Sequence, residues 1–300
     1  MTEEGRADAA RFGNVLRVPV PGGYVVCRHR SGNPSTHRPV LFLPGWGADW
    51  EYFADLFDEV DHDVPLYFLE SREKRSSEIA PGASYSMPRF ARDVALAVHA
   101  LGLGATDYVL VGTCFGSGVL LETLRRKLVT PTISVLFDPM PRLWVPRWIL
   151  HWIVPLLPIR LVALLRPTVR RALLYGMTEE AQRARTRKII DSAVLPKWKP
   201  GSFQIRDWSA YEAAPRVTVE VHVLNAASDR FHDGSVYPFI ASLMPNGTYI
   251  RFFIEGRDRE RFMGTVVNAY SRSRGKTIPP ELAAIALIVK PTNEGSEVGS

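Results

Sequence analysis

The sequence is poor in cysteine, with only Cys27 and Cys114 in 300 residues, which is too few for a disulfide framework. We expect both thiols to be reduced, as in a cytoplasmic protein. The sequence also lacks a Cys/His cluster with metal-ligand spacing and a glycine-rich phosphate loop. We therefore expect no metal, no cofactor and no nucleic-acid partner.

Long apolar runs are absent as well. Residues 1–13 are polar and lack the apolar core of a signal peptide. The most apolar stretch, residues 148–165, is interrupted by His151, Pro155, Pro158 and Arg160, so it does not read as a transmembrane span. These absences favour a cytoplasmic location, and no internal repeat is found.

The overall composition is that of a globular protein, with 46% hydrophobic and 23% charged residues. Its length suits one large α/β domain, or a core domain with an inserted cap. The net charge of +6 is compatible with an acidic partner, a membrane surface, an anionic substrate or simple solubility.

Short apolar segments alternate with amphipathic ones along most of the chain. The predicted strands are residues 15–18, 24–28, 40–43, 65–69, 108–111, 132–137, 217–224 and 248–254. The predicted helices are residues 50–60, 87–101, 235–244, 260–272 and 280–289. This alternation predicts an α/β fold, a mostly parallel sheet flanked by helices. Residues 141–211 break the rhythm with helical, Trp- and Arg-rich segments and no clear strand.

The segment Tyr108–Val119 reads YVLVGTCFGSGV and joins a predicted strand to a predicted helix. Its G-x-C-x-G motif is typical of a nucleophile elbow with cysteine in place of serine. Gly112 and Gly116 allow the two backbones to pass closely. The following helix N-terminus favours a negative charge and so lowers the pKa of a thiol placed there.

Three features together resemble the α/β-hydrolase fold: the elbow, the turn Pro44-Gly45-Trp46-Gly47 after the third strand, and the helical insertion. The resemblance covers residues 15–290. It implies a core of residues 15–140 and 212–290, with a helical cap (residues 141–211) inserted after the sixth strand. Residues 1–14 and 291–300 are then expected to be flexible termini.

The resemblance also implies roles for particular residues. The oxyanion hole would use the backbone N–H groups of Trp46 and Phe115. The acid of a catalytic triad would be Asp229, which follows the strand after the cap, or Asp138, which ends the preceding strand.

The base departs from the family pattern. The family's histidine follows the last strand, usually after a glycine, but here Gly256 is followed by Arg257, and no histidine occurs after His232. Relatives of dienelactone hydrolases and polyhydroxyalkanoate synthases use cysteine at the elbow but keep that histidine. Arginine does not release its proton in proteins, so Arg257 cannot act as a base.

Three possibilities follow for the missing base. His232 can swing towards Cys114 from its loop, or His151 can reach it from the cap, whereas His222 lies within a strand that hides or pairs it. Alternatively, the helix N-terminus and Arg257 stabilise the Cys114 thiolate without a base, which suits esters and thioesters with good leaving groups. The third possibility is a different reaction or no reaction, because the fold hosts lyases, cyclases and silent binding proteins.

The cap carries tryptophans at positions 144, 148 and 152, which lie on one helical face. Trp148 and Trp152 would line an apolar acyl pocket whose basic rim suits an acyl-carrier protein or coenzyme A. Ordinary packing over the core and a helix lying on a membrane surface fit the same pattern. The charged segment Glu70–Glu78 begins at the elbow's edge of the sheet, so that Arg72 or Glu70 would contact substrate, unless the segment is simply solvated.

The sequence therefore predicts an acyl hydrolase or acyltransferase acting on an apolar ester or thioester through Cys114, with an atypical or incomplete triad. The alternatives are a non-hydrolytic lyase or cyclase of a natural-product-like substrate and a catalytically silent ligand-binding protein.

Overall fold

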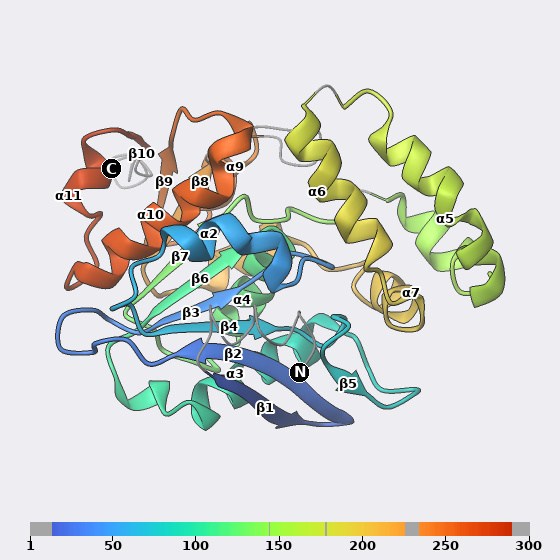
Figure 1. Ribbon diagram of the computed structural model, residues 1–300, viewed down its shortest axis with the longest axis horizontal. Helices are drawn as coiled ribbons and strands as arrows, with labels where there is room; N and C mark the ends of the chain where they lie inside the picture. Colours follow the sequence, from blue (N-terminus) through green and yellow to red (C-terminus); the bar gives the residue numbers. More distant parts are fainter. Residues whose placement is uncertain (1–13, 144, 178, 226–233, 290–300) are drawn as a thin grey trace, which may run out of the picture.

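The computed structural model describes residues 14–143, 145–177, 179–225 and 234–289, and its centre is a ten-stranded sheet (Figure 1). The strand order is β1-β2-β4-β3-β6-β7-β8-β9-β10, and β5 pairs with β2. The strands are β1 (Asn14–Val20), β2 (Gly23–Arg30), β3 (Val40–Leu43), β4 (Leu66–Glu70), β5 (Glu78–Ile79), β6 (Val109–Thr113), β7 (Ile133–Phe137), β8 (Val221–Asn225), β9 (Gly247–Arg251) and β10 (Leu287–Val289).

The middle of the sheet is parallel, from β4 through β3, β6, β7 and β8 to β9. The strands β1, β2 and β10 add antiparallel edges. The central strands β3, β6, β7 and β8 are buried along their whole length, as their unbroken apolar sequences predict for a sheet covered on both faces. The predicted fold class is confirmed.

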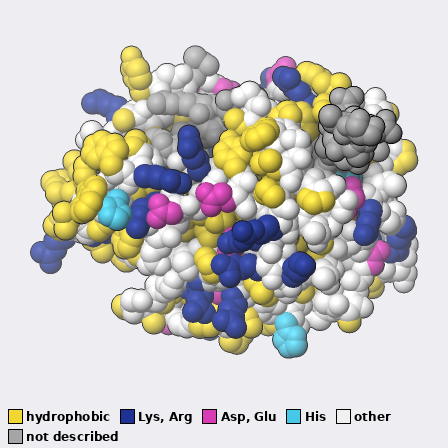
Figure 2. Space-filling view, turned by 180° about the vertical axis from the view of Figure 1, so that it is seen from behind, with side chains coloured by type: hydrophobic (Ala, Val, Ile, Leu, Met, Phe, Trp, Pro, Cys, Tyr) yellow, Lys and Arg dark blue, Asp and Glu magenta, His cyan; other side chains and the backbone are white. Residues whose placement is uncertain are grey.

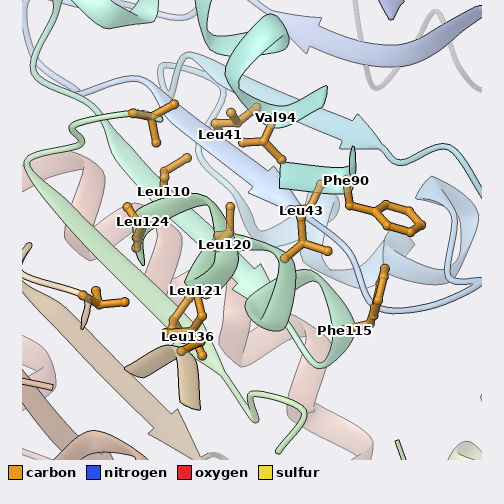
Figure 3. Packing of buried hydrophobic residues seen from close by; sticks show 14 of the residues in the cluster. Leu41, Leu43, Phe90, Val94, Leu110, Phe115, Leu120, Leu121, Leu124 and Leu136 are labelled. Carbon is orange, nitrogen blue, oxygen red and sulfur yellow. The ribbon is translucent and has the colours of Figure 1, made fainter. Parts of the chain in front are cut away.

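Helices cover the sheet on both faces. Leu41 and Leu43 point to the face that carries α3 (Met87–Ala100), α4 (Phe115–Arg125) and α9 (Tyr237–Ser242). Figure 3 shows part of this cluster, with side chains of β3, β6 and β7 against those of α3 and α4. Val40 and Phe42 point to the other face, against α2 (Ala54–Glu59) and α10 (Arg259–Arg272). The period of two along β3 thus divides its side chains between two cores.

Short helices and 3-10 turns connect the longer elements. They are η1 (Trp50–Phe53), η2 (Leu103–Ala105), α8 (Ala210–Ala213), η4 (Ala214–Arg216), η5 (Gly256–Asp258) and α11 (Pro280–Ala283). α3 has Pro88 in its first turn and ends before Gly102, which has φ +67°, as the positions of proline and glycine in the sequence predict.

Two details of the strand and helix predictions are wrong. The predicted helix over 280–289 ends at Ala283, and Leu287–Val289 forms β10 instead, which pairs antiparallel with β9. This short apolar run pairs with the backbone N–H and C=O groups at the open edge of β9. Local propensity does not indicate such a long-range pairing. The two-residue strand β5 was not predicted, so the cap segment follows the seventh strand, β7, and not the sixth.

The cap segment (residues 141–211) contains η3, a π-helix (Ile149–Ile153), and the helices α5 (Ile159–Leu174), α6 (Glu180–Asp191) and α7 (Leu195–Gln204). In Figure 1 these helices lie at the right, at the opposite end of the molecule from α11 and β10. The segment is anchored through α7, whose Trp198 ring lies 5.7 Å from that of Trp46. Across the described ranges, no helix combines the length and the hydropathy needed to cross a membrane.

Candidate active site

Cys114 lies at a sharp turn between β6 and α4, with φ 51° and ψ −113°. Positive φ is unfavourable for a residue with a Cβ, and such strain is often found at functional positions. The flanking glycines are required by close approach. A Cβ on Gly116 would lie 2.2 Å from the Leu43 carbonyl oxygen, and one on Gly112 would lie 2.9 Å from the Ser117 nitrogen. The backbone therefore has the geometry that the motif predicts for a nucleophile elbow.

The loop after β3 lies directly beside Cys114. A Cβ built on Gly45 would be 3.3 Å from the Cys114 Cβ. Within the described ranges, the backbone N–H groups of Trp46 and Phe115 have no hydrogen-bond acceptor. The Trp46 and Phe115 rings also contact each other edge to face at 4.8 Å, which fixes the loop against the start of α4. Two unpaired N–H groups beside a thiol are the donors an oxyanion needs.

A buried pair that sequence reasoning missed lies under this loop. The Lys74 Nζ donates to the Gly45 carbonyl and lies 2.5 Å from the Glu73 Oε1. Both side chains are buried. On the cap side, Lys197 donates to the carbonyl oxygens of Lys74 and Ser77. Burial lowers the pKa of Lys197, although the charges of Glu73 and Glu78 oppose this shift.

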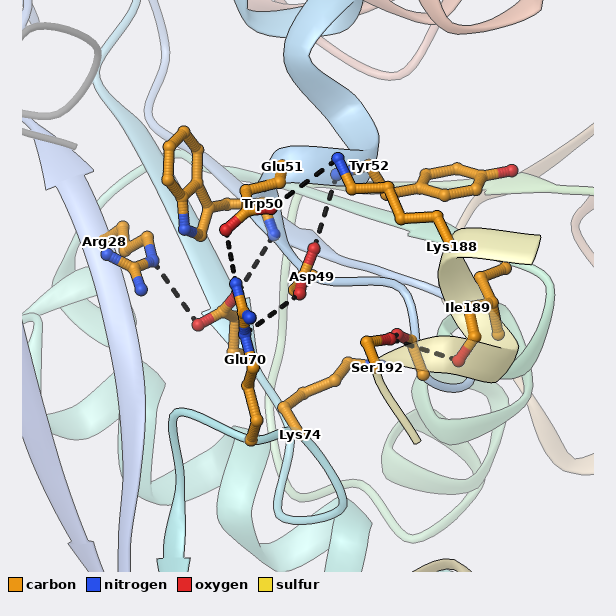
Figure 4. A network of polar contacts seen from close by, with 12 residues as sticks. Arg28, Asp49, Trp50, Glu51, Tyr52, Glu70, Lys74, Lys188, Ile189 and Ser192 are labelled. Carbon is orange, nitrogen blue, oxygen red and sulfur yellow. Dashed lines mark hydrogen bonds and ion pairs between the residues drawn. The ribbon is translucent and has the colours of Figure 1, made fainter. Parts of the chain in front are cut away.

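The start of the charged segment is part of the core, which corrects both of its sequence interpretations. Glu70 is buried and accepts from the Trp50 backbone N–H at 3.0 Å, with the Arg28 Nε at 3.4 Å (Figure 4). Arg72 is also buried and donates two hydrogen bonds to Asp93, at 2.6 and 2.7 Å. Burial raises the pKa of Asp93 to about 6, against the opposing attraction of Arg72. Arg72 therefore joins β4 to α3 and does not face a substrate.

Asp138 lies immediately after β7, next to the elbow. The Cys114 N–H donates to the Phe137 carbonyl, and the Met140 N–H donates to the Cys114 carbonyl. Asp138 has φ 43° and a fully buried side chain. Its Oδ1 accepts from the Asn225 Nδ2 at 2.6 Å, and its Oδ2 accepts from the Arg259 Nη2 at 2.7 Å. Both oxygens of this candidate acid are thus already hydrogen-bonded.

The arginine that pairs with Asp138 is Arg259, whereas Arg257, predicted to stabilise the Cys114 thiolate, pairs with Glu255 on the surface. Arg257 is 69% exposed and pairs with Glu255 at 2.8 Å. The turn η5 then redirects the chain, so that Arg259 begins α10 on its buried face. Burial alone would lower the pKa of Arg259, but the charges of Asp138, Tyr52 and Glu260 raise it above its ordinary value. The helical spacing of Arg259, Met263 and Val267 was the signal in the sequence that could have located it.

No histidine is hydrogen-bonded to Cys114 in the part of the chain that the structure describes. His222 is buried, and its Nδ1 lies 2.5 Å from the Tyr270 hydroxyl. His151 is exposed and stacks edge to face against Trp152. Asp229 and His232, the predicted acid and base, lie outside the described residues.

The structure does not support the predicted role in lining an acyl pocket at Trp148 and Trp152, which are exposed, and Trp144 lies outside the described residues. Trp148 and Trp152 lie on the outer surface of the cap segment. The tryptophan that does reach the site is Trp198 of α7. A Cβ built on Gly47, which has φ +69°, would lie 2.1 Å from its Cζ2 atom.

A cavity of about 420 Å³ opens between η1 and α6, and its lining is charged. It is lined by Asp49, Glu51, Arg75, Ala184, Arg187, Lys188, Asp191 and Ser192. Arg75 lies 3.4 Å from Asp49, and Lys188 lies 3.7 Å from Glu51, so opposite charges meet across it. This cavity does not include Cys114 and is not the apolar acyl pocket.

Comparison with known proteins agrees with the fold. The sequence model of the alpha/beta hydrolase family matches residues 40–261, which include β3, the elbow, the cap and the start of α10. The chain belongs to the alpha/beta hydrolase family. No curated protein sequence matches it.

Solved structures with the same fold include an esterase from Exiguobacterium antarcticum, with 16% identity, a TM-score of 0.67, and coverage of 84% of this chain and 97% of the esterase. The enol-lactonase from Burkholderia xenovorans LB400 has 15% identity and a TM-score of 0.65, covering 85% of this chain and 99% of the lactonase. A thermophilic esterase from Thermogutta terrifontis has 16% identity and a TM-score of 0.61, covering 85% and 96%. At these identities the similarity establishes the fold.

Proposed function

We propose that this protein is an acyl hydrolase or acyltransferase that acts on an apolar ester or thioester through Cys114. The observation that carries the proposal is the elbow itself. Cys114 has strained backbone angles, and the N–H groups of Trp46 and Phe115, in the segments on either side of it, have no acceptor among the described residues. The esterase and lactonase titles of similar structures support acyl chemistry on this fold.

In the proposed reaction, the Cys114 thiolate forms a bond to the acyl carbon, and the carbonyl electrons move onto oxygen. The two N–H groups stabilise this oxyanion, which collapses as the bond to the alkoxide or thiolate leaving group breaks. Water then attacks the acyl-cysteine and releases the acid in hydrolysis, whereas an alcohol, amine or thiol does so in transfer. Because a thiol is partly ionised at neutral pH, the first step needs a base less than serine would. His232 stays a candidate for the base and Asp229 for its acid.

A second candidate function is that of a ligand-binding protein without turnover. The pair between Arg259 and Asp138 favours it, because a buried arginine lies where a family member using Asp138 as its acid would place a histidine. A lyase or cyclase that uses the oxyanion donors without a covalent step is also compatible with this arrangement.

The test compares the wild type with Cys114→Ala and Cys114→Ser on p-nitrophenyl esters and acyl thioesters of increasing chain length. We expect Cys114→Ala to abolish turnover, and the wild type to show the mass of an acyl adduct by intact mass spectrometry after a rapid acid quench. Full turnover in Cys114→Ala would exclude covalent catalysis. Saturable ligand binding without turnover in the wild type would favour the binding protein.

A further inference from the structure

An apolar surface covers the outer side of the cap segment, and no other part of the described chain covers it. Ten large apolar side chains between residues 148 and 175 are exposed; they are Trp148, Trp152, Ile153, Leu156, Ile159, Leu161, Leu164, Leu165, Val169 and Tyr175. The helix α5 has no buried residue at all. We call these residues the outer cap face. An exposed patch of this size marks an interaction site.

The sequence of this segment carries charges of one sign, although Arg170 pairs with Asp191 of α6 at 3.1 Å. Between Asp138 and Glu179 the sequence has no acidic residue but six arginines, at positions 142, 147, 160, 166, 170 and 171. Arg147, Arg160 and Arg171 are exposed, and the described chain offers them no ion pair. Figure 2 shows Lys and Arg side chains among the apolar ones at the end of the molecule where the cap lies.

We propose that the outer cap face binds the surface of an anionic lipid bilayer. Aliphatic and tryptophan side chains would enter the boundary between headgroups and acyl chains, and the arginines would pair with lipid phosphates. The exposed tryptophans fit the interfacial depth that this residue prefers. A second copy of the chain fits less well, because a twofold contact would bring the arginines of both faces together.

Leu156 and Leu164 allow a clean test, because they are 82% and 75% exposed and their replacement leaves the core unchanged. The experiment measures cosedimentation with sucrose-loaded vesicles of phosphatidylcholine, with and without about one third phosphatidylglycerol. We expect the wild type to bind only the anionic vesicles. Leu156→Glu/Leu164→Glu should weaken binding at least about tenfold, because carboxylates replace the inserted groups. The control is Ile285→Glu, an apolar position that is 59% exposed and lies between α11 and β10, at the opposite end of the molecule (Figure 1).

Charge is tested separately with Arg160→Glu/Arg171→Glu against Lys276→Glu, an exposed cation outside the cap. We expect the arginine pair to lose at least about tenfold in binding and the lysine control to be unchanged. Equal sedimentation of the wild type and both cap variants would overturn the proposal. So would a wild-type dimer that ignores vesicles and becomes monomeric in Leu156→Glu/Leu164→Glu, since the face would then bind a second copy. Binding only to an acidic carrier protein would overturn it as well.

A different observation supports a second inference, which rests on the proposed function. The Gly45 carbonyl accepts from the Lys74 Nζ, and the N–H of the same peptide group is that of Trp46, the candidate oxyanion donor. In a trans peptide the C=O and N–H point in opposite directions. A donor that is hydrogen-bonded to the C=O therefore also fixes the direction of the N–H. We infer that Lys74 is a positioning residue, which orients and polarises the Gly45–Trp46 peptide for the oxyanion.

The surroundings of Lys74 agree with a fixed ammonium group. Glu73 Oε1 accepts from the same Nζ, and both side chains are at most 2% exposed. The Glu73 Oε2 has no hydrogen-bond partner among the described residues, so Lys74 is the side chain to which this carboxylate is hydrogen-bonded there. Lys197 closes the loop from the cap side without touching Gly45.

The test separates this role from charge stabilisation of the thiolate. Glu73→Gln/Lys74→Met removes both buried charges together and so avoids leaving one unpaired. We expect kcat on a p-nitrophenyl ester to fall about 10- to 100-fold with little change in KM. The orientation of the Trp46 N–H stabilises the oxyanion, which forms in the transition state and not in the bound substrate. Alkylation of Cys114 by iodoacetamide forms no oxyanion, so its rate and pH profile should stay those of the wild type.

Lys197→Met is the matched control, because it loosens the same loop without touching Gly45. An equal fall of kcat in both variants would mean that Lys74 only holds the loop. An unchanged kcat in Glu73→Gln/Lys74→Met would also contradict the positioning role. So would a change in the pH profile of Cys114 alkylation in this variant. Absence of wild-type turnover would instead contradict the proposed function, and this inference with it.

Discussion

Replacing Arg259 by methionine tests the buried pair with Asp138, which is the largest departure from a hydrolase triad in the described chain. The substitution removes contacts of 2.7 and 3.3 Å and leaves a fully buried carboxylate with Asn225 as its remaining side-chain partner. Removing one member of such a pair typically costs about 3–5 kcal/mol of unfolding free energy. This is a large share of the roughly 5–15 kcal/mol of a typical domain.

The matched control is an exposed pair with similar geometry. Arg272 lies 2.8 Å from Asp61, with side chains 48% and 46% exposed. Arg272→Met should therefore cost less than about 1 kcal/mol. The double variant Arg259→Met/Asp138→Asn should recover much of the lost unfolding free energy, because it removes the unpaired buried carboxylate. Asparagine also tolerates the positive φ at position 138.

The assay is urea unfolding followed by circular dichroism, with the slope compared among variants. Arg259→Met and Arg272→Met of equal stability would refute the reasoning, since burial would then make no difference to the pair. A double variant no more stable than Arg259→Met would also contradict it, because the loss would not come from the unpaired carboxylate.

Two further predictions concern the core. Because burial raises the pKa of Asp93 from 3.8 to about 6, the folded state keeps a proton that the unfolded state has released, so stability should fall by roughly 3 kcal/mol as pH rises from about 4 to 6. Unfolding curves of Asp93→Asn should lack this slope, and an identical slope would exclude Asp93 as its source. Gly116→Ala should lose at least about 1–3 kcal/mol in thermal unfolding, because its Cβ would meet the Leu43 oxygen. Gly104→Ala, with open space around its Cβ, should be neutral, and equal losses would contradict the close approach.

The fold was predictable from the sequence because its signals are local. Strands such as Val40–Leu43 are continuous apolar runs, and the glycines of the elbow stand where the backbones touch. The run Leu287–Val289 shows the limit of local signals, since only the edge of β9 decides that it becomes a strand.

The candidate site was less predictable because it depends on burial and on small shifts along the chain. The three residues of η5 decide that Arg259 and not Arg257 meets Asp138. Nothing in the run ESREKRSSE distinguishes the buried Glu73 and Lys74 from a solvated loop. Likewise, the periodicity of α5 indicates an apolar face but not whether the rest of the chain covers it.

The contact between Gly47 and Trp198 limits which substitutions evolution can accept at these two positions. A Cβ at position 47 and a ring at position 198 compete for the same space, with only 2.1 Å between them. A side chain at position 47 would therefore need a smaller residue at position 198, and it would still have to adopt the positive φ of this turn. Among relatives with the same cap segment, a side chain at position 47 should occur only together with a smaller residue at position 198, and this pairing would record how α7 and the loop after β3 changed together.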